Sequence, residues 1–185
     1  MTQILPVNDA ADILPEHRDS PVGLLLEYQN LGRALDPPGS HPLLIGMCMD
    51  NRKSLRMPID FAFVLRTAGA NMRDNEFRIS YAIAVGGVRT IALIAHTDCG
   101  MKRVASLHDE FVRGLMEHAG WDEARAERMF AEGVPKFGIA DEVDFVMHEA
   151  ARLRGLYPKI TVVPLLYRVE DDRLYQLHDQ AKGAP

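Results

Sequence analysis

Apolar residues in this chain occur either in short continuous runs or at helical spacing. Continuous runs rich in β-branched residues are typical of strands buried on both faces. Four such runs predict strands at about 42–48, 61–65, 90–95 and 159–163. Apolar residues spaced three or four apart predict amphipathic helices at about 24–35, 74–85 and 141–153, with two shorter helices inside 105–137. Alternating strands and helices are typical of an α/β protein with a parallel sheet and right-handed crossovers.

Several boundaries follow from local signals. Asp74 is a plausible N-cap for the helix at 74–85, and the glycine pair at 86–87 ends it. Its expected buried face is Phe77, Tyr81, Ala84 and Val85. Residues 165–177 either extend the last strand or add an edge strand.

The sequence predicts a short N-terminal segment followed by one domain. Residues 1–21 contain three prolines among mixed apolar and acidic residues, so we expect an N-terminal arm outside the core. Residues 22–185 form a single domain, which suits a chain of 185 residues.

Composition narrows the function classes. A net charge of −5 and a pI near 5.8 argue against nucleic acid or an anionic membrane surface as the main partner. No apolar run approaches the roughly 20 residues needed to span a bilayer, and we expect no secretory signal. Two cysteines without a disulfide framework fit a reducing compartment, so we expect a cytoplasmic protein.

Both cysteines lie at the polar ends of predicted strands, and His96 precedes Cys99 by three residues. Buried cysteines often only fill space. A redox pair is the other alternative, but Cys48 and Cys99 form no C-x-x-C motif. Two thiolates and one imidazole favour zinc, with a fourth position open as in catalytic sites.

Asp50 and Arg52 follow Cys48 directly. They could form a surface ion pair of little consequence. Alternatively, Asp50 accepts a proton from the water on the metal, and Arg52 keeps that carboxylate ionised and off the metal.

The metal hypothesis also fixes the sheet order. If Cys48 and Cys99 share an ion, the first and third predicted strands are neighbours. The strand order is then 2-1-3-4, numbered along the chain. This is a Rossmann-like three-layer arrangement, and its switch point lies at the metal.

The motif Cys48-x-Asp50-x-Arg52, followed by His96-x-x-Cys99-Gly100, resembles the β-class carbonic anhydrases. The resemblance extends over about residues 40–175. It includes the segment Arg66-Thr-Ala-Gly69, the helix start at Asp141 and a closing hairpin at 166–174.

The resemblance implies zinc held by Cys48, His96 and Cys99, and a homodimer or higher homo-oligomer. It implies reversible hydration of CO2 to bicarbonate, with zinc-bound hydroxide as nucleophile, Asp50 orienting it and Arg52 holding Asp50. The implied substrate-binding residues are Arg66, Ala68, Gly69 and Gly100, the last through a backbone N–H.

Three departures from the pattern of the family concern substrate binding. The family often has a Gln just before the first strand that helps to hold bicarbonate, but residues 36–41 contain none, although His41 could line the pocket. Thr67 replaces an Asn, and Pro164 stands in a segment where Gly is common. Two alternatives therefore stand beside CO2 hydration: hydrolysis of carbonyl sulfide or carbon disulfide at the same zinc, or a non-catalytic dimer that binds zinc or bicarbonate.

Overall fold

The computed structural model describes residues 1–35 and 42–179. Its elements run along the chain as follows: β1 Thr2–Leu5, α1 Pro21–Asn30, β2 Leu43–Cys48, β3 Ala62–Thr67, α2 Glu76–Ala84, β4 Thr90–His96, α3 His108–Ala119, α4 Glu123–Phe137, α5 Glu142–Leu156, β5 Thr161–Arg168 and β6 Arg173–Asp179. In this part of the chain, no helix has the length and apolar character needed to cross a membrane.

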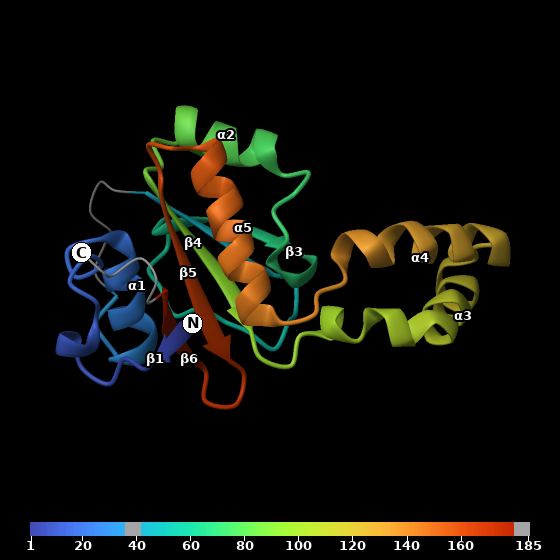
Figure 1. Ribbon diagram of the computed structural model, residues 1–185, viewed down its shortest axis with the longest axis horizontal. Helices are drawn as coiled ribbons and strands as arrows, with labels where there is room; N and C mark the ends of the chain where they lie inside the picture. Colours follow the sequence, from blue (N-terminus) through green and yellow to red (C-terminus); the bar gives the residue numbers. More distant parts are fainter. Residues whose placement is uncertain (36–41, 180–185) are drawn as a thin grey trace.

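The strands form one six-stranded sheet in the order β1-β6-β5-β4-β2-β3 (Figure 1). The segment β3-β2-β4-β5 is parallel throughout and confirms the predicted order 2-1-3-4. β6 pairs with β5 antiparallel, so 165–177 contains the end of one strand, a turn and a second hairpin strand, which is not at the sheet edge because β1 covers it. The predicted α/β class is therefore confirmed.

Apolar layers cover both faces of the sheet. On one face, Leu25 and Leu26 of α1 pack with Ile45 and Ile94 of the central strands. On the other face, Ile79 of α2 and residues of α5 pack against the opposite sides of the same strands. Because β2 and β4 are covered twice, nearly every side chain in them is buried, which explains their continuous apolar sequence.

The N-terminal segment differs from the expected arm outside the core. β1 pairs with β6 and so extends the chain's own sheet. Val7 and Ile13 are each 1% exposed and belong to the same core layer as α1. Gln176, fully buried, accepts a hydrogen bond from the backbone of Leu14 and donates one to Asp12. No local sequence pattern predicts these contacts, because they join residues about 160 positions apart.

The prediction for the helix at 74–85 was wrong about its cap and its buried face. Asn75 is the N-cap, without a side-chain capping bond. The buried residues are Ile79 and Ala82, whereas Phe77 is 83% exposed. The apolar stripe thus faces away from the sheet.

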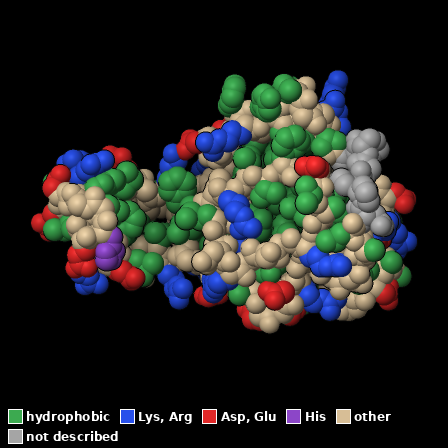
Figure 2. Space-filling model, turned by 180° about the vertical axis from the view of Figure 1, so that it is seen from behind, with side chains coloured by type: hydrophobic (Ala, Val, Ile, Leu, Met, Phe, Trp, Pro, Cys, Tyr) green, Lys and Arg blue, Asp and Glu red, His purple; other side chains and the backbone are tan. Residues whose placement is uncertain are grey.

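The strand predicted at 61–65 is not buried, because β3 is the sheet edge. The exposed side chain of Phe63 lies on the face of β3 that α2 covers, and Figure 2 shows hydrophobic side chains gathered over this region. We call this set the α2–β3 apolar surface: Phe63, Phe77, Tyr81 and Val85.

The first helix also ends earlier than expected, at Asn30. The two helices expected inside 105–137 are α3 and α4, which form a hairpin projecting from the body (Figure 1). The ring of Phe130 packs against Phe111 and His108 between them, with centroid distances of 5.3 and 4.9 Å.

Candidate metal centre

Three sulfur and nitrogen ligand atoms converge at the carboxyl ends of β2 and β4. The two strands are parallel neighbours, so Cys48 and His96 end at the same edge of the sheet. Cys99 follows after a turn in which Asp98 has φ 53°. The candidate ligand atoms of Cys48, His96 and Cys99 lie within 4.8 Å of one another, and all three residues are buried.

His96 is oriented to accept a cation. Its Nδ1 lies 2.9 Å from the carbonyl oxygen of Thr97, which fixes the proton on that nitrogen. Nε2 is buried and has no hydrogen-bond partner among the described residues. A buried polar atom without a partner is costly, and a zinc ion would satisfy it. The set of two sulfurs and one imidazole nitrogen therefore fits Zn²⁺.

The two cysteines are free, and their sulfur atoms share a hydrogen bond. The pKa of Cys48 is lowered, because its sulfur accepts a hydrogen bond from Cys99 and others from the backbone of Asp50 and Gly69. The pKa of Cys99 is raised by that same bond and by burial. One sulfur of the pair is thus already suited to bind a cation as a thiolate.

Asp50 lies beside these ligands and is held by Arg52. Nη2 of Arg52 lies 2.8 Å from Oδ2 of Asp50, and Nε lies 3.1 Å from Oδ1. This contact is the main reason that the pKa of Asp50 lies well below its usual range. Oδ2 of Asp50 is 3.9 Å from Nε2 of His96. An ionised carboxylate therefore stands next to the ligand cluster without entering it.

Arg66 is placed differently from the sequence-based expectation of a substrate ligand. Its guanidinium donates to the backbone carbonyls of Cys48 at 3.3 Å, Asp50 at 3.4 Å and Lys53 at 3.2 Å. These bonds hold the loop after β2. A direct role in substrate binding stays a prediction.

The other predicted substrate-binding residues surround the cluster. Ala68 and Gly69 form a short turn after β3, and Gly69 has φ 62°. Gly100 begins a 3-10 turn, Gly100–Lys102. His41 lies outside the described residues.

Two acidic residues of the site escaped sequence analysis. Asp98 accepts hydrogen bonds from Arg52, and its place between His96 and Cys99 was the available signal. Glu142, in the first turn of α5, accepts the backbone N–H of Cys99 at 3.3 Å and pairs with Lys102 at 3.0 Å.

An apolar wall borders the sulfur atoms. Ile139 is buried against Cys48 and Cys99, and Met101 and Phe145 pack against this cluster. The site thus has a polar side at Asp50 and an apolar side at Ile139.

Sequence comparison finds relatives for part of the chain. A carbon disulfide hydrolase from Acidianus sp. is 33% identical over 139 residues, which are 72% of this chain and 65% of that protein. The β-carbonic anhydrase 1 of Mycobacterium bovis is 36% identical over 90 residues, 45% of this chain and 53% of that protein. The chain thus spans less than two thirds of these curated relatives. No family model matches it.

Solved structures share the fold. A β-carbonic anhydrase from Trichomonas vaginalis superposes with a TM-score of 0.59 at 19% identity, covering 78% of this chain and 87% of its own. A carbonic anhydrase from Glaciozyma antarctica gives a TM-score of 0.57 at 22% identity, covering 88% and 94%. This similarity shows that the chain has the fold of the β-carbonic anhydrases, and the sequence relatives and the Cys48, His96 and Cys99 cluster support its membership of that family.

Proposed function

We propose that the chain is a zinc-dependent lyase that interconverts CO2 and bicarbonate. Cys48, His96 and Cys99 are the proposed ligands, and Asp50 with Arg52 is the proposed catalytic dyad. The observation that carries the proposal is the ionised Asp50 carboxylate, held by Arg52 at 2.8 Å and lying 3.9 Å from the unpartnered nitrogen of His96.

Zinc bound to the three ligands would supply a Lewis acid that makes water a nucleophile near neutral pH. Asp50, with Oδ2 3.9 Å from Nε2 of His96, would accept a hydrogen bond from that water and orient it. Arg52 holds Asp50 in its ionised form and away from the ligand atoms. The backbone N–H of Gly100 is the proposed donor to a developing anion, as a preorganised dipole.

The apolar side of the site suits a small, uncharged, linear substrate. Met101, Ile139 and Phe145 offer no hydrogen-bonding group from their side chains, so they admit CO2 more readily than an ion. The same property favours a second candidate function, hydrolysis of carbon disulfide or carbonyl sulfide. The similarity to a carbon disulfide hydrolase supports this alternative.

We further propose a homodimer, or a larger assembly built from it, in the cytoplasm. The α2–β3 apolar surface contains Phe77, 83% exposed, and Tyr81, 56% exposed, beside the free edge of the sheet. Apolar surfaces of this kind mark protein interfaces, and an unpaired edge strand invites pairing with another chain. A reducing cytoplasm would keep both cysteines available as ligands.

The test of the activity compares three substrates with one zinc-loaded preparation. We expect the rate of CO2 hydration to exceed the hydrolysis of carbonyl sulfide and carbon disulfide. The reverse order would identify the protein as a carbonyl sulfide or carbon disulfide hydrolase. If none of the three substrates is turned over, a non-catalytic protein is favoured. Zinc content should be about one per chain and should fall in Cys48→Ser and Cys99→Ser.

The test of the assembly is the mass in solution. Phe77→Asp and Tyr81→Asp together should shift the protein to monomers in analytical ultracentrifugation. Ile59→Asp changes another exposed apolar residue, outside the α2–β3 apolar surface, and serves as the control. A wild-type protein that sediments as a monomer would reject the dimer.

A further inference from the structure

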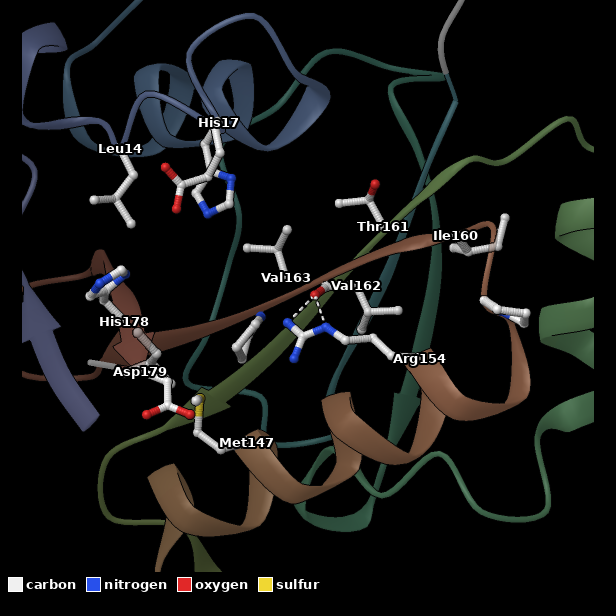
Figure 3. Close-up of a pocket in the computed structure, with 14 residues that line it drawn as sticks. Leu14, His17, Met147, Arg154, Ile160, Thr161, Val162, Val163, His178 and Asp179 are labelled. Atoms are coloured by element: carbon white, nitrogen blue, oxygen red, sulfur yellow. Dashed lines mark hydrogen bonds between the residues drawn. The ribbon is translucent and has the colours of Figure 1, made fainter. Parts of the chain in front are cut away.

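A cavity lies where β5 and β6 separate, at the end of the sheet away from the metal ligands (Figure 3). The ladder between the two strands ends at the pair Leu165 and Gln176. The preceding residue of β5 is Pro164, which has no N–H to continue the ladder. β6 instead continues against β1 as far as Asp179. The resulting gap has a volume of about 510 Å³, within the range of small-molecule sites.

Arg154, in the last turn of α5, points into the centre of this cavity (Figure 3). Its Nε and Nη2 both donate to the carbonyl oxygen of Val162, the Nε contact being 3.0 Å. This carbonyl lies on the stretch of β5 from which β6 has departed. The bonds fix the guanidinium plane and leave the N–H groups of Nη1 without a hydrogen bond among the described residues. The guanidinium is therefore preorganised for a further acceptor.

No carboxylate in the described part of the chain forms an ion pair with Arg154. Burial lowers its pKa, and no neighbouring acid opposes that effect. A partly buried cation that forms no ion pair is destabilising, and an anionic ligand in contact with the guanidinium would correct it. Arg152, two residues earlier, shows the contrast, because it pairs with Glu149 at 2.7 Å and with Glu76 at 2.8 Å.

The remaining charged groups limit the ligand. His17, His178, Glu16 and Asp179 also line the cavity. Burial lowers the pKa of His17, Glu16 opposes this effect, and Arg154 and His178 add to it. Two carboxylates in one cavity disfavour a ligand with two negative charges.

Most of the remaining wall is apolar. Its residues come from the segment before α1, from α5, from the turn before β5 and from both strands: Leu14, Met147, Ile160, Val163, Pro164 and Leu177. A ligand that fills the cavity therefore needs an apolar body as well as a charge.

We propose that this cavity binds an aliphatic monocarboxylate, with its carboxylate on Arg154 and its chain along the apolar wall. Guanidinium and carboxylate groups match in geometry and charge, and a single charge suits the acidic residues of the lining. The site lies at the amino end of β5, whereas the metal ligands lie at the carboxyl ends of β2 and β4. The proposal does not depend on the proposed enzymatic function.

The test is isothermal titration of the full-length protein with hexanoate, hexanol, acetate and inorganic phosphate. Hexanoate should bind at one saturable site. Acetate lacks the apolar body and hexanol lacks the charge, so each should bind at least tenfold more weakly. Phosphate should also bind more weakly than hexanoate. No hexanoate binding, or binding of hexanol or phosphate as tight as that of hexanoate, would overturn the proposal.

Variants locate the site. Arg154→Gln removes the cation, and Met147→Trp fills the cavity while leaving Arg154 in place; each should weaken hexanoate binding at least tenfold. Arg89→Gln is the matched control, because Arg89 also donates to two backbone carbonyls but outside the cavity. Unfolding temperatures identify any variant that does not fold. If Arg154→Gln does not fold, the hexanoate affinity of Met147→Trp tests the site. Wild-type affinity in Met147→Trp would place hexanoate elsewhere and refute the site.

Discussion

Arg52 donates to Asp98 twice, with Nη1 2.8 Å from the carboxylate Oδ2 and Nη2 2.8 Å from the backbone carbonyl oxygen. The same guanidinium holds Asp50. It thereby connects the loop after β2 to the turn before Cys99. Asp98 in that turn therefore helps to hold Arg52 and Asp50 in position.

We predict that Asp98→Ala lowers kcat/KM for CO2 about fivefold without loss of zinc. The loss is modest because the side chain of Asp98 is 54% exposed, and exposed ion pairs contribute little. Stopped-flow hydration assays and zinc analysis provide the measurement. Asp109→Ala removes another exposed acid, on α3, and should leave the rate unchanged. An equal loss in both variants would contradict the bracing role of Asp98.

Ile13 should contribute as a core residue although it precedes the first long helix. We predict that Ile13→Ala lowers the free energy of unfolding by about 2–4 kcal/mol, as for other fully buried aliphatic side chains. Ile59→Ala, at a position 88% exposed, should change it by less than about 0.5 kcal/mol. Urea denaturation at fixed protein and zinc concentration compares them. Similar midpoints would mean that residues 1–21 do not pack as described.

Gly69 occupies a left-handed conformation with φ 62° next to Cys48. An added Cβ would lie 3.4 Å from the side chain of Met101. We predict that Gly69→Ala destabilises the protein by about 1–2 kcal/mol and weakens zinc binding, because the backbone N–H directed at Cys48 shifts.

The control for Gly69 is Gly133→Ala in α4, where the new methyl group meets no atom within 4 Å. This substitution should stabilise the helix by about 0.5–1 kcal/mol. Thermal unfolding with and without zinc distinguishes the two variants. A Gly69→Ala protein with wild-type stability and zinc affinity would be inconsistent with the strained turn.

His108 makes the hairpin of α3 and α4 sensitive to pH. Its contacts with Asp109 at 2.8 Å and Glu127 at 2.7 Å raise its pKa above the ordinary value of 6.5. A raised pKa in the folded state means that this stabilisation is complete below about pH 6.5 and is lost as the pH rises through the folded-state value. Amide hydrogen exchange of α4, corrected for intrinsic rates, should show lower protection at pH 8.5 than at pH 6.

The variant His108→Gln should remove most of that pH dependence. His118→Gln, at another exposed histidine of α3, is the control and should retain it. If His108→Gln keeps the wild-type dependence, the effect belongs to other groups.

The strands that the sequence predicted most directly are those buried on both faces of the sheet. Residues 43–48 and 90–96 are covered on both faces, so their continuous apolar sequence was sufficient to predict buried strands. The α2 helix shows the limit of this reasoning. Its apolar stripe is real, but Phe77 and Tyr81 are exposed while Ile79 and Ala82 are buried. An apolar stripe does not reveal whether it faces the chain's own core or a partner.

The site shows the same division. The spacing of His96 and Cys99 after an apolar strand was sufficient to group them with Cys48. The bond from Arg52 to Asp98 joins residues 46 positions apart and depends on a turn with φ 53°, which no local pattern encodes. The direction of Arg66 toward three backbone carbonyls likewise depends on how the loop after β2 folds.

The most direct test of the proposed enzyme is kcat/KM for CO2 hydration, measured by stopped flow on zinc-loaded wild type and Asp50→Asn. The amide accepts the proton poorly, so we expect the variant to retain about one zinc per chain and to lose at least a hundredfold in rate. Asp9→Asn, a change at the acid that caps the 3-10 turn Ala10–Asp12, should match wild type. A wild-type protein that carries zinc but does not accelerate hydration, or an Asp50→Asn protein as active as wild type, would contradict the account.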